Sequence, residues 1–150
     1  MTKIIYVDAD ACPVRDNIIS IAIRHEVSVV MVCNGGIRPH PHPLITLKVV
    51  PSGPDEADKW IAEMITEHDV LITSDIPLAA RAVEKKAIVI RPDGSSLTKD
   101  NIGNTLAMRD LMADIRAADP FHQSKSKPFS ASDKAQFNQT LDQTLLRMGT

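Results

Sequence analysis

The sequence lacks any apolar run of the roughly 20 residues that a membrane-spanning helix needs, and cysteine is scarce. The two cysteines, Cys12 and Cys33, each lie beside a short apolar run. That placement predicts small buried thiols in the reduced state, and it argues against a disulfide framework. An acid as early as Asp8 is not typical of a signal peptide. We therefore expect a cytoplasmic protein with no membrane partner.

An excess of positive charge is also missing, since 17 Lys and Arg stand against 19 Asp and Glu, for a net charge of −2. A nucleic-acid partner would therefore depend on a local basic patch and on bridging cations. The length of 150 residues, with 43% hydrophobic and 24% charged content, is typical of one globular domain, which we place at residues 1–150. Nothing in these numbers indicates an oligomeric state.

Short apolar segments rich in β-branched residues predict about five strands. They lie at residues 4–7, 27–32, 44–50, 70–73 and 87–90. Continuous apolar runs of this kind are typical of strands that are buried on both faces of a parallel sheet. Helical patterns begin near Pro13, Asp55 and Asp75, and a fourth contains Met108, Leu111, Met112 and Ile115. This alternation over residues 1–117 predicts an α/β core, with helices on both faces of a mostly parallel central sheet.

One connection departs from the alternation. Residues 34–43 contain Pro39, Pro41 and Pro43, which remove backbone donors and exclude a helix. The third strand is therefore expected to follow an irregular loop, and its direction stays open. His40 and His42 in this loop suit a solvated segment better than a transition-metal site, since a third ligand is missing nearby.

The last part of the chain changes character. Residues 118–131 are polar and contain two Pro-Phe pairs, which predicts a flexible connector with two aromatic anchors. Residues 132–148 follow with a stripe at helical spacing formed by Phe137, Leu141, Leu145 and Met148. We expect this C-terminal helix to dock on the core.

Four aspartates carry the functional hypothesis. Asp8 and Asp10 follow the first predicted strand and would point the same way if extended geometry persists, while Asp75 follows the fourth strand. Asp58 lies in the first turn of the second helix, on its buried stripe. In parallel sheets, ligands bind at the carboxyl ends of the strands. Because crowded carboxylates repel one another and hard oxygen ligands suit hard cations, the four predict a Mg²⁺ or Mn²⁺ site with a catalytic role.

The alternative interpretation is structural. Asp55 with Asp58 fits the start of a helix, Asp75 fits an N-cap, and Asp8 fits a group that accepts from loop amides. Basic residues placed to contact a phosphate near the metal are Arg38, Arg81, Arg91, Lys125 and Lys127. The three arginines are as well explained as solvated surface side chains.

Specific motifs resemble a known family. They are IYVDADACPV at residues 5–14, ADKWI at 57–61, ITSDIPLAAR at 72–81 and PFS at 128–130. The chain resembles, over nearly its whole length, the YaiI/YqxD family of uncharacterised bacterial proteins. That family looks like a member of the PIN-like group, whose better-known members are metal-dependent nucleases. The resemblance implies a PIN-like three-layer sandwich in which Asp8, Asp58 and Asp75 are the site acids and Asp10 is an additional one.

The first functional hypothesis is therefore metal-dependent phosphodiester hydrolysis, with RNA as the first candidate substrate. A second hypothesis takes Asp8 as the nucleophile and Asp10 as the general acid of a haloacid-dehalogenase-like phosphatase. It is weaker because Asp93-Gly94 reverses the Gly-Asp pair that such enzymes carry. A third hypothesis is a non-catalytic module that binds a metal or a protein partner.

Overall fold

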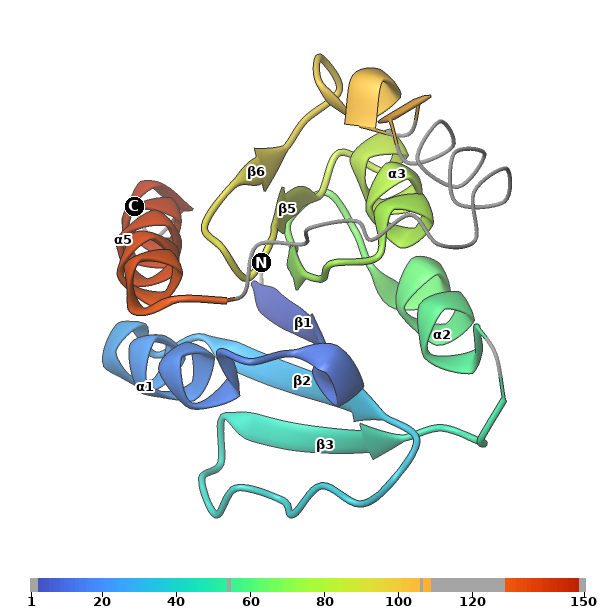
Figure 1. Cartoon of the computed structure of the whole chain (residues 1–150). Coiled ribbons are helices and arrows are strands. Elements are labelled where there is room, and N and C mark those ends of the chain that lie inside the picture. Colours follow the sequence, from blue (N-terminus) through green and yellow to red (C-terminus); the bar gives the residue numbers. More distant parts are fainter. Residues whose placement is uncertain (1–2, 54, 106, 109–128, 149–150) are drawn as a thin grey trace.

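The computed structural model describes residues 3–53, 55–105, 107–108 and 129–148 and contains one six-stranded sheet (Figure 1). The strand order is β3-β2-β1-β4-β5-β6. The strands are β1 Ile4–Asp8, β2 Ser28–Cys33, β3 Ile45–Val49, β4 Val70–Ile72, β5 Ile88–Ile90 and β6 Ser96–Leu97. The first five are parallel and β6 is antiparallel to β5. The mostly parallel sheet predicted from the sequence is confirmed, with one more short strand than expected.

Helices cover both faces of this sheet, as a three-layer sandwich requires. They are α1 Arg15–His25, α2 Glu56–Met64, α3 Ile76–Glu84 and α5 Ala131–Met148, and a 3₁₀ turn, η1, spans Ala9–Ala11. Residues 102–105 and 107–108 are also helical, where the fourth helix was expected. Its other predicted core residues, Leu111, Met112 and Ile115, lie outside the described residues.

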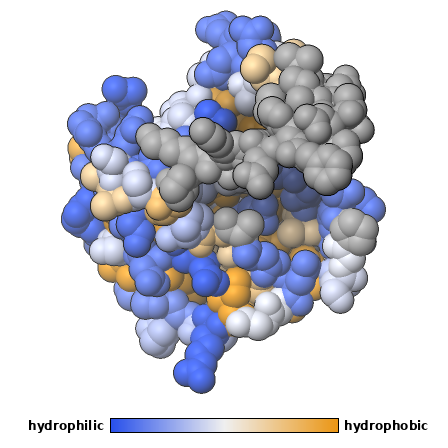
Figure 2. All heavy atoms as spheres, in the orientation of Figure 1, coloured by the Kyte–Doolittle hydropathy of each residue, from blue (hydrophilic) through white to orange (hydrophobic). Residues whose placement is uncertain are grey.

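Two apolar cores result, one on each face. The first joins α1 and α5 to side chains such as Ile5 and Val7 of β1, and the second joins α2 and α3 to Tyr6 and Leu71. Alternate residues of β1 thus point into opposite cores, which explains why the strand reads as a continuous apolar run. Figure 2 shows that the described surface in this view is mostly hydrophilic, with smaller hydrophobic areas among the polar side chains.

The loop between β2 and β3 resolves the direction that the sequence left open. Val29 of β2 pairs with Ile45 of β3, and the two strands are parallel. Residues 34–44 therefore lead from the end of β2 back to the edge of the sheet at which β2 begins, and they do so without a helix. Within the loop, His42 Nδ1 accepts a hydrogen bond of 3.1 Å from the Leu44 amide. This contact places His42 in the turn before β3.

Helix α5 docks through the stripe expected for it, since Phe137, Leu141 and Leu145 are buried. It lies against α1 (Figure 1), where Asn17 Nδ2 donates to Asn138 Oδ1 at 2.9 Å. The helix begins at Ala131, one residue before the predicted bound. The preceding Phe129, an expected anchor, is 40% exposed, and Phe121 lies outside the described residues. Among the helices that the structure describes, none is long and apolar enough to cross a membrane.

Candidate functional site

Asp8 and Asp75, two of the acids predicted from the sequence, lie at the ends of β1 and β4, between which the order of the strands reverses. Strands β2 and β3 lie on one side of β1, and β4 and β5 lie on the other. In open parallel sheets this switch point, at the carboxyl ends of the two central strands, is where ligands bind. Asp8 is the last residue of β1, Thr73 is the first residue after β4, and Asp75 lies two residues beyond Thr73.

Thr73 connects the two acids. Its side chain is buried, with 2% exposure, and its Oγ1 donates a hydrogen bond of 3.2 Å to Asp8 Oδ2. The same oxygen accepts the Asp75 amide at 3.0 Å. Asp75 in turn is the N-cap of α3, because its Oδ1 accepts the Leu78 amide at 2.9 Å. One buried hydroxyl therefore fixes the positions of Asp8 and Asp75.

Asp58 completes this group from the first turn of α2. The pKa of its carboxyl is raised to about 7, first by burial and then by the charge of Asp75 and a hydrogen bond to it, with smaller effects of Asp8 and Asp55. With this raised pKa, Asp58 holds its proton more strongly than an ordinary carboxyl does. We call Asp8, Asp58, Thr73 and Asp75 together the acidic edge.

The charges of the acidic edge also act on Asp8. Burial raises its pKa most, and the charges of Asp75 and Asp10 raise it further, while the hydrogen bond from Thr73 opposes them. Three carboxylates from β1, α2 and the start of α3 thus interact electrostatically. The clustering of Asp8, Asp58 and Asp75 that the sequence indicated is present in the fold.

Asp10 takes a different position. Strand β1 ends at Asp8 and η1 begins at Ala9, so the extended geometry that would align Asp8 and Asp10 does not persist. Asp10 is exposed, and its Oδ2 accepts the Asn34 amide at 2.8 Å. Asp10 therefore ties the start of the β2–β3 loop to the end of β1, and its charge still reaches Asp8.

The structural interpretation of these acids holds in part. Asp75 caps α3 as that interpretation expects, and Asp10 satisfies a loop amide. Asp55 occupies the N-cap position of α2 but its side chain makes no capping hydrogen bond there. Asp8 accepts from a hydroxyl, which helix capping does not explain. Capping therefore accounts for Asp75 and leaves the contact between Asp75 and Asp58 without a structural reason.

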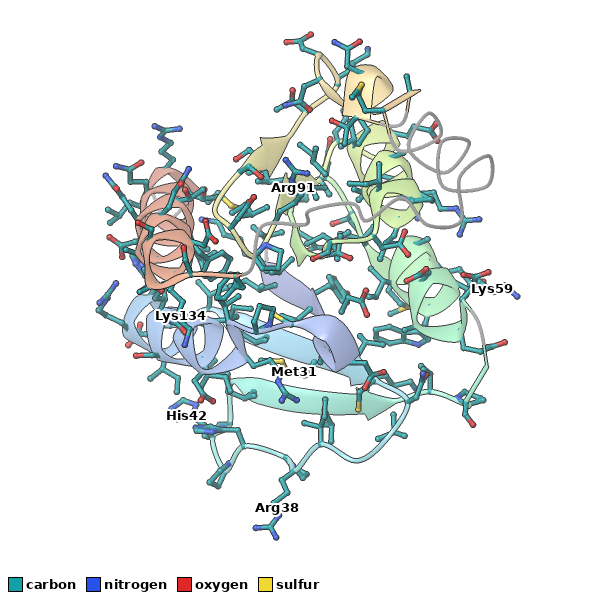
Figure 3. The ribbon with its side chains drawn as sticks, in the orientation of Figure 1. Met31, Arg38, His42, Lys59, Arg91 and Lys134 are labelled. Atoms are coloured by element: carbon teal, nitrogen blue, oxygen red, sulfur yellow. The ribbon has the colours of Figure 1, made fainter. Side chains whose placement is uncertain are left out.

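The described basic candidates lie in three separate places. Arg38 is on the β2–β3 loop and points away from the body of the protein (Figure 3). Arg81 is exposed in the last turn of α3. The Nε of Arg91 donates to Ser95 Oγ at 2.7 Å within the turn between β5 and β6. Lys125 and Lys127 lie outside the described residues.

The chemistry of the acidic edge fits a hard cation, although its side chains are not arranged around one. In the part of the chain that the structure describes, no three His, Cys, Asp or Glu side chains are placed to hold a metal ion as they stand. The donors are all oxygens, from carboxylates and one hydroxyl, which is the set that Mg²⁺ and Mn²⁺ prefer. The raised pKa of Asp58, to which the charges of Asp75 and Asp8 contribute, indicates an excess of negative charge at this place.

Two site features were missed by the sequence analysis. Thr73 was not singled out, although its place two residues before Asp75 at a strand end was the available signal. The hydrogen bond between Asn34 and Asp10 had no sequence signal, because it joins the ends of two different strands. Cys12 and Cys33 are buried free thiols, as expected, and burial raises the pKa of Cys12 to about 11.

Comparison with known proteins gives a consistent family. Residues 6–147 match the sequence profile of the uncharacterised YaiI/YqxD family. Among similar proteins, a UPF0178 protein of Cereibacter sphaeroides ATCC 17025 is 52% identical over 94% of this chain and 88% of its own. A UPF0178 protein of Roseobacter denitrificans is 49% identical over 97% of both chains, and one of Parvibaculum lavamentivorans is 50% identical over 97% of this chain and 94% of its own. No solved structure matches the chain.

Proposed function

Since the chain belongs to the YaiI/YqxD family, which is described as uncharacterised, we propose its function from the chemistry of the acidic edge. The proposal is a divalent-metal-dependent nuclease that hydrolyses phosphodiester bonds, with RNA as the first candidate substrate. The observation that carries it is the convergence of Asp8, Asp58 and Asp75 at the switch point of the sheet.

Besides burial, the charge of Asp75 raises the pKa values of Asp8 and Asp58, which supports one shared functional site over three separate helix caps. The charge of Asp75 and a hydrogen bond to it both raise the pKa of Asp58, an effect that helix capping does not require. Like charges that are held close together destabilise a fold, and such clusters are typical of functional sites. In the proposed function, a bound cation neutralises the carboxylates and also the phosphate of the substrate.

Asp8, Asp58 and Asp75 would hold Mg²⁺ or Mn²⁺, which would activate water and neutralise charge on the phosphate oxygens. Thr73 keeps the Asp8 carboxylate oriented through its hydroxyl. The pKa of Asp58 is about 7 in the metal-free protein, so binding of the cation would displace the proton that this carboxyl holds below that pH. We assign Asp10 the role of positioning the β2–β3 loop beside this edge, because its oxygen accepts the Asn34 amide.

The test uses the full-length protein with Mn²⁺ and a fluorescein-labelled single-stranded RNA. The wild-type protein should cleave it, and Asp8→Asn should abolish cleavage while preserving the fold, because an amide oxygen still accepts from Thr73. The matched control is Glu84→Gln, which removes an exposed carboxylate at the end of α3 and should cleave normally. An Asp8→Asn variant that cleaves RNA as fast as the wild type would exclude the acidic edge as the active site.

The phosphatase and the non-catalytic module are separated by the same preparation. Hydrolysis of p-nitrophenyl phosphate that depends on both Asp8 and Asp10, without cleavage of RNA, would replace the nuclease by the phosphatase. Metal binding without turnover of either substrate would indicate the non-catalytic module.

A further inference from the structure

A cavity of about 440 Å³ lies between the end of α5 and the part of the sheet formed by β5 and β6 (Figure 1). It exists because β6, Ser96–Leu97, is only two residues long. The chain turns away from β5 at Thr98, whose amide donates to Asn101 Oδ1 at 2.7 Å. Ile88, the first residue of β5, therefore has no pairing partner in β6 and lines the cavity. The volume is within the range of pockets that hold small organic molecules.

The wall of the cavity is mostly apolar. Its apolar side chains come from α3, β5, β6 and α5 and the segment before β5, and they are Val83, Ala87, Ile88, Val89, Leu97 and Met148. Ile88 is 37% exposed, which leaves a large apolar side chain open to water at the edge of the sheet. A ligand that covers this wall removes apolar surface from water, and that removal favours binding.

The charged residues of the cavity are all basic. They are Lys86, Lys99 and Arg147, and no acidic side chain is among the described residues that line it. The whole chain has a net charge of −2, so a cavity with three cations departs from the average of the protein. Within the described residues, the ammonium groups of Lys86 and Lys99 make no ion pair. The cavity is therefore complementary to an anionic group.

Lys86 has an unfavourable backbone conformation. It lies two residues after the end of α3 and has a φ of 67°, in the left-handed region where glycine is the usual residue at the end of a helix. Its amide donates to the Val83 carbonyl at 2.9 Å, and the Ala87 amide donates to the Ala82 carbonyl at 3.0 Å. These bonds involve backbone alone, so glycine would make them with less strain. A lysine here is better explained by a role of its ammonium group than by the fold.

We propose that this cavity binds a small amphipathic anion, which is a molecule with an apolar body and a carboxylate at one end. The apolar body packs against Ile88 and Met148, and the ammonium groups of Lys86 and Lys99 bind the carboxylate. The site is separate from the acidic edge, because Ile88 begins β5 whereas Asp8 ends β1, and β1, β4 and β5 are parallel. The inference therefore does not depend on the proposed nuclease function.

The experiment uses octanoate as the probe. It is titrated into isotope-labelled full-length protein, and the backbone amide signals are followed by NMR. The signals of residues 86–89, 96–99 and 144–148 should shift and saturate. Acetate lacks the apolar body and octan-1-ol lacks the charge, so each should bind at least about tenfold more weakly than octanoate. Octanoate shifts confined to other residues, or acetate that binds as tightly as octanoate, would overturn the proposal.

The charge of the cavity is tested with a double variant. Lys86→Gln with Lys99→Gln should weaken octanoate binding about tenfold, since each exposed ion pair contributes roughly a factor of three. The matched control is Lys59→Gln with Lys134→Gln, which neutralises two exposed lysines elsewhere on α2 and α5 (Figure 3). It should change affinity by less than about twofold, because distant surface charges are screened. Equal losses in the two double variants would exclude the cavity as the site.

Two single variants separate binding from folding. Lys86→Gly relieves the left-handed strain, so the urea midpoint of unfolding should rise while octanoate affinity falls about threefold. Ile88→Thr keeps a β-branched residue in β5 and should weaken octanoate binding about fourfold, with no effect on acetate. If Lys86→Gly gains stability and binds octanoate like the wild type, Lys86 has no role in binding. If Ile88→Thr also binds like the wild type, the cavity assignment is wrong.

Discussion

Asp8 accepts a hydrogen bond of 3.2 Å from Thr73, a residue that lies on the neighbouring strand end and is itself almost fully buried. The same hydroxyl accepts the amide of Asp75 at 3.0 Å. Thr73 uses its donor on one acid and its acceptor on the backbone of the other, so it fixes the spacing of both. In the proposed metal site, Thr73 would affect metal affinity by orienting Asp8 and Asp75, without being a ligand itself.

Thr73→Val tests this role, because valine keeps the branched shape and removes the hydroxyl. We expect the free energy of unfolding to fall by about 1–3 kcal/mol, since the partly buried Asp75 amide loses its acceptor. We also expect Mn²⁺ affinity to fall about 10-fold to 100-fold, the usual effect of losing a group that orients ligands. Isothermal titration calorimetry and urea unfolding measure the two effects. Thr73→Ser is the control, and it should keep metal affinity because it keeps the hydroxyl; equal losses in the two variants would assign Thr73 to packing alone.

Asp8→Asn and Asp75→Asn should each weaken Mn²⁺ binding about tenfold or more, because affinity at hard-cation sites depends on the number of charged ligands. Both variants should stay folded. Asparagine is as good an N-cap as aspartate, so the side-chain oxygen of the Asp75→Asn variant still accepts the Leu78 amide. The control is Asp69→Asn, which changes a buried carboxylate at the other end of β4 and should leave calorimetric metal affinity unchanged. Unchanged affinity in both site variants would remove the metal from the acidic edge.

The pKa of Asp58 predicts a specific pH dependence of stability. Its value is about 7 in the folded protein, against an ordinary value of 3.8. Between these values the folded state holds a proton that the unfolded state has lost, so the free energy of unfolding falls as pH rises from 3.8 to about 7. Asp58→Asn removes this charge. In EDTA, the variant should therefore melt above the wild type at pH 8 and close to it at pH 4.

Mn²⁺ should reverse this order at pH 8, because the wild type gains a bound cation that the Asp58→Asn variant holds less well. Glu63→Gln, at an exposed position of the same helix, is the control and should show neither effect. A lower melting temperature of Asp58→Asn at both pH values in EDTA would instead mean that the carboxylate stabilises the start of α2.

Much of the fold was predictable because periodicity reports burial directly. The stripes that contain Ile18 and Leu141 predicted α1 and α5, and both residues are fully buried. The direction of β3 was not predictable, since an irregular loop of residues 34–44 permits either direction. Strand β6 was missed because two residues give no pattern, and its antiparallel pairing follows from the turn in which Arg91 and Ser95 are bonded.

The site was predictable where it depends on strand ends and not where it depends on contacts between segments. Asp8 and Asp75 were placed correctly because the carboxyl ends of parallel strands meet at one edge of the sheet. The position of Asp10 was not predictable in this way, because a 3₁₀ turn begins directly after β1 and changes the direction of the chain. The burial of Asp69 was not predictable for the same reason. This residue is 3% exposed because its carboxylate accepts hydrogen bonds from the distant Ile4 amide and from Thr66.

The docking of α5 depends on a close contact with the turn between β5 and β6. Gly94 has a φ of +90°, and a Cβ built there would lie 2.7 Å from the carbonyl carbon of Gln136 and 2.8 Å from the amide nitrogen of Phe137. The carbonyl of Gly94 also accepts a hydrogen bond of 2.9 Å from Thr140 Oγ1. A methyl group at this position must therefore displace the backbone of α5, because no flexible side chain alone can make room.

Gly94→Ala should lower the free energy of unfolding by roughly 2–5 kcal/mol, from left-handed backbone strain together with overpacking. Gly103→Ala is the matched control, because no atom lies within 4 Å of its would-be Cβ and residues 102–105 are helical. It should be neutral or stabilising by about 0.4–1 kcal/mol. Urea unfolding followed by Trp60 fluorescence measures global stability, and limited proteolysis reports the release of α5. If Gly94→Ala unfolds at the same urea concentration as Gly103→Ala and α5 stays protected, α5 does not pack against this turn as closely as described.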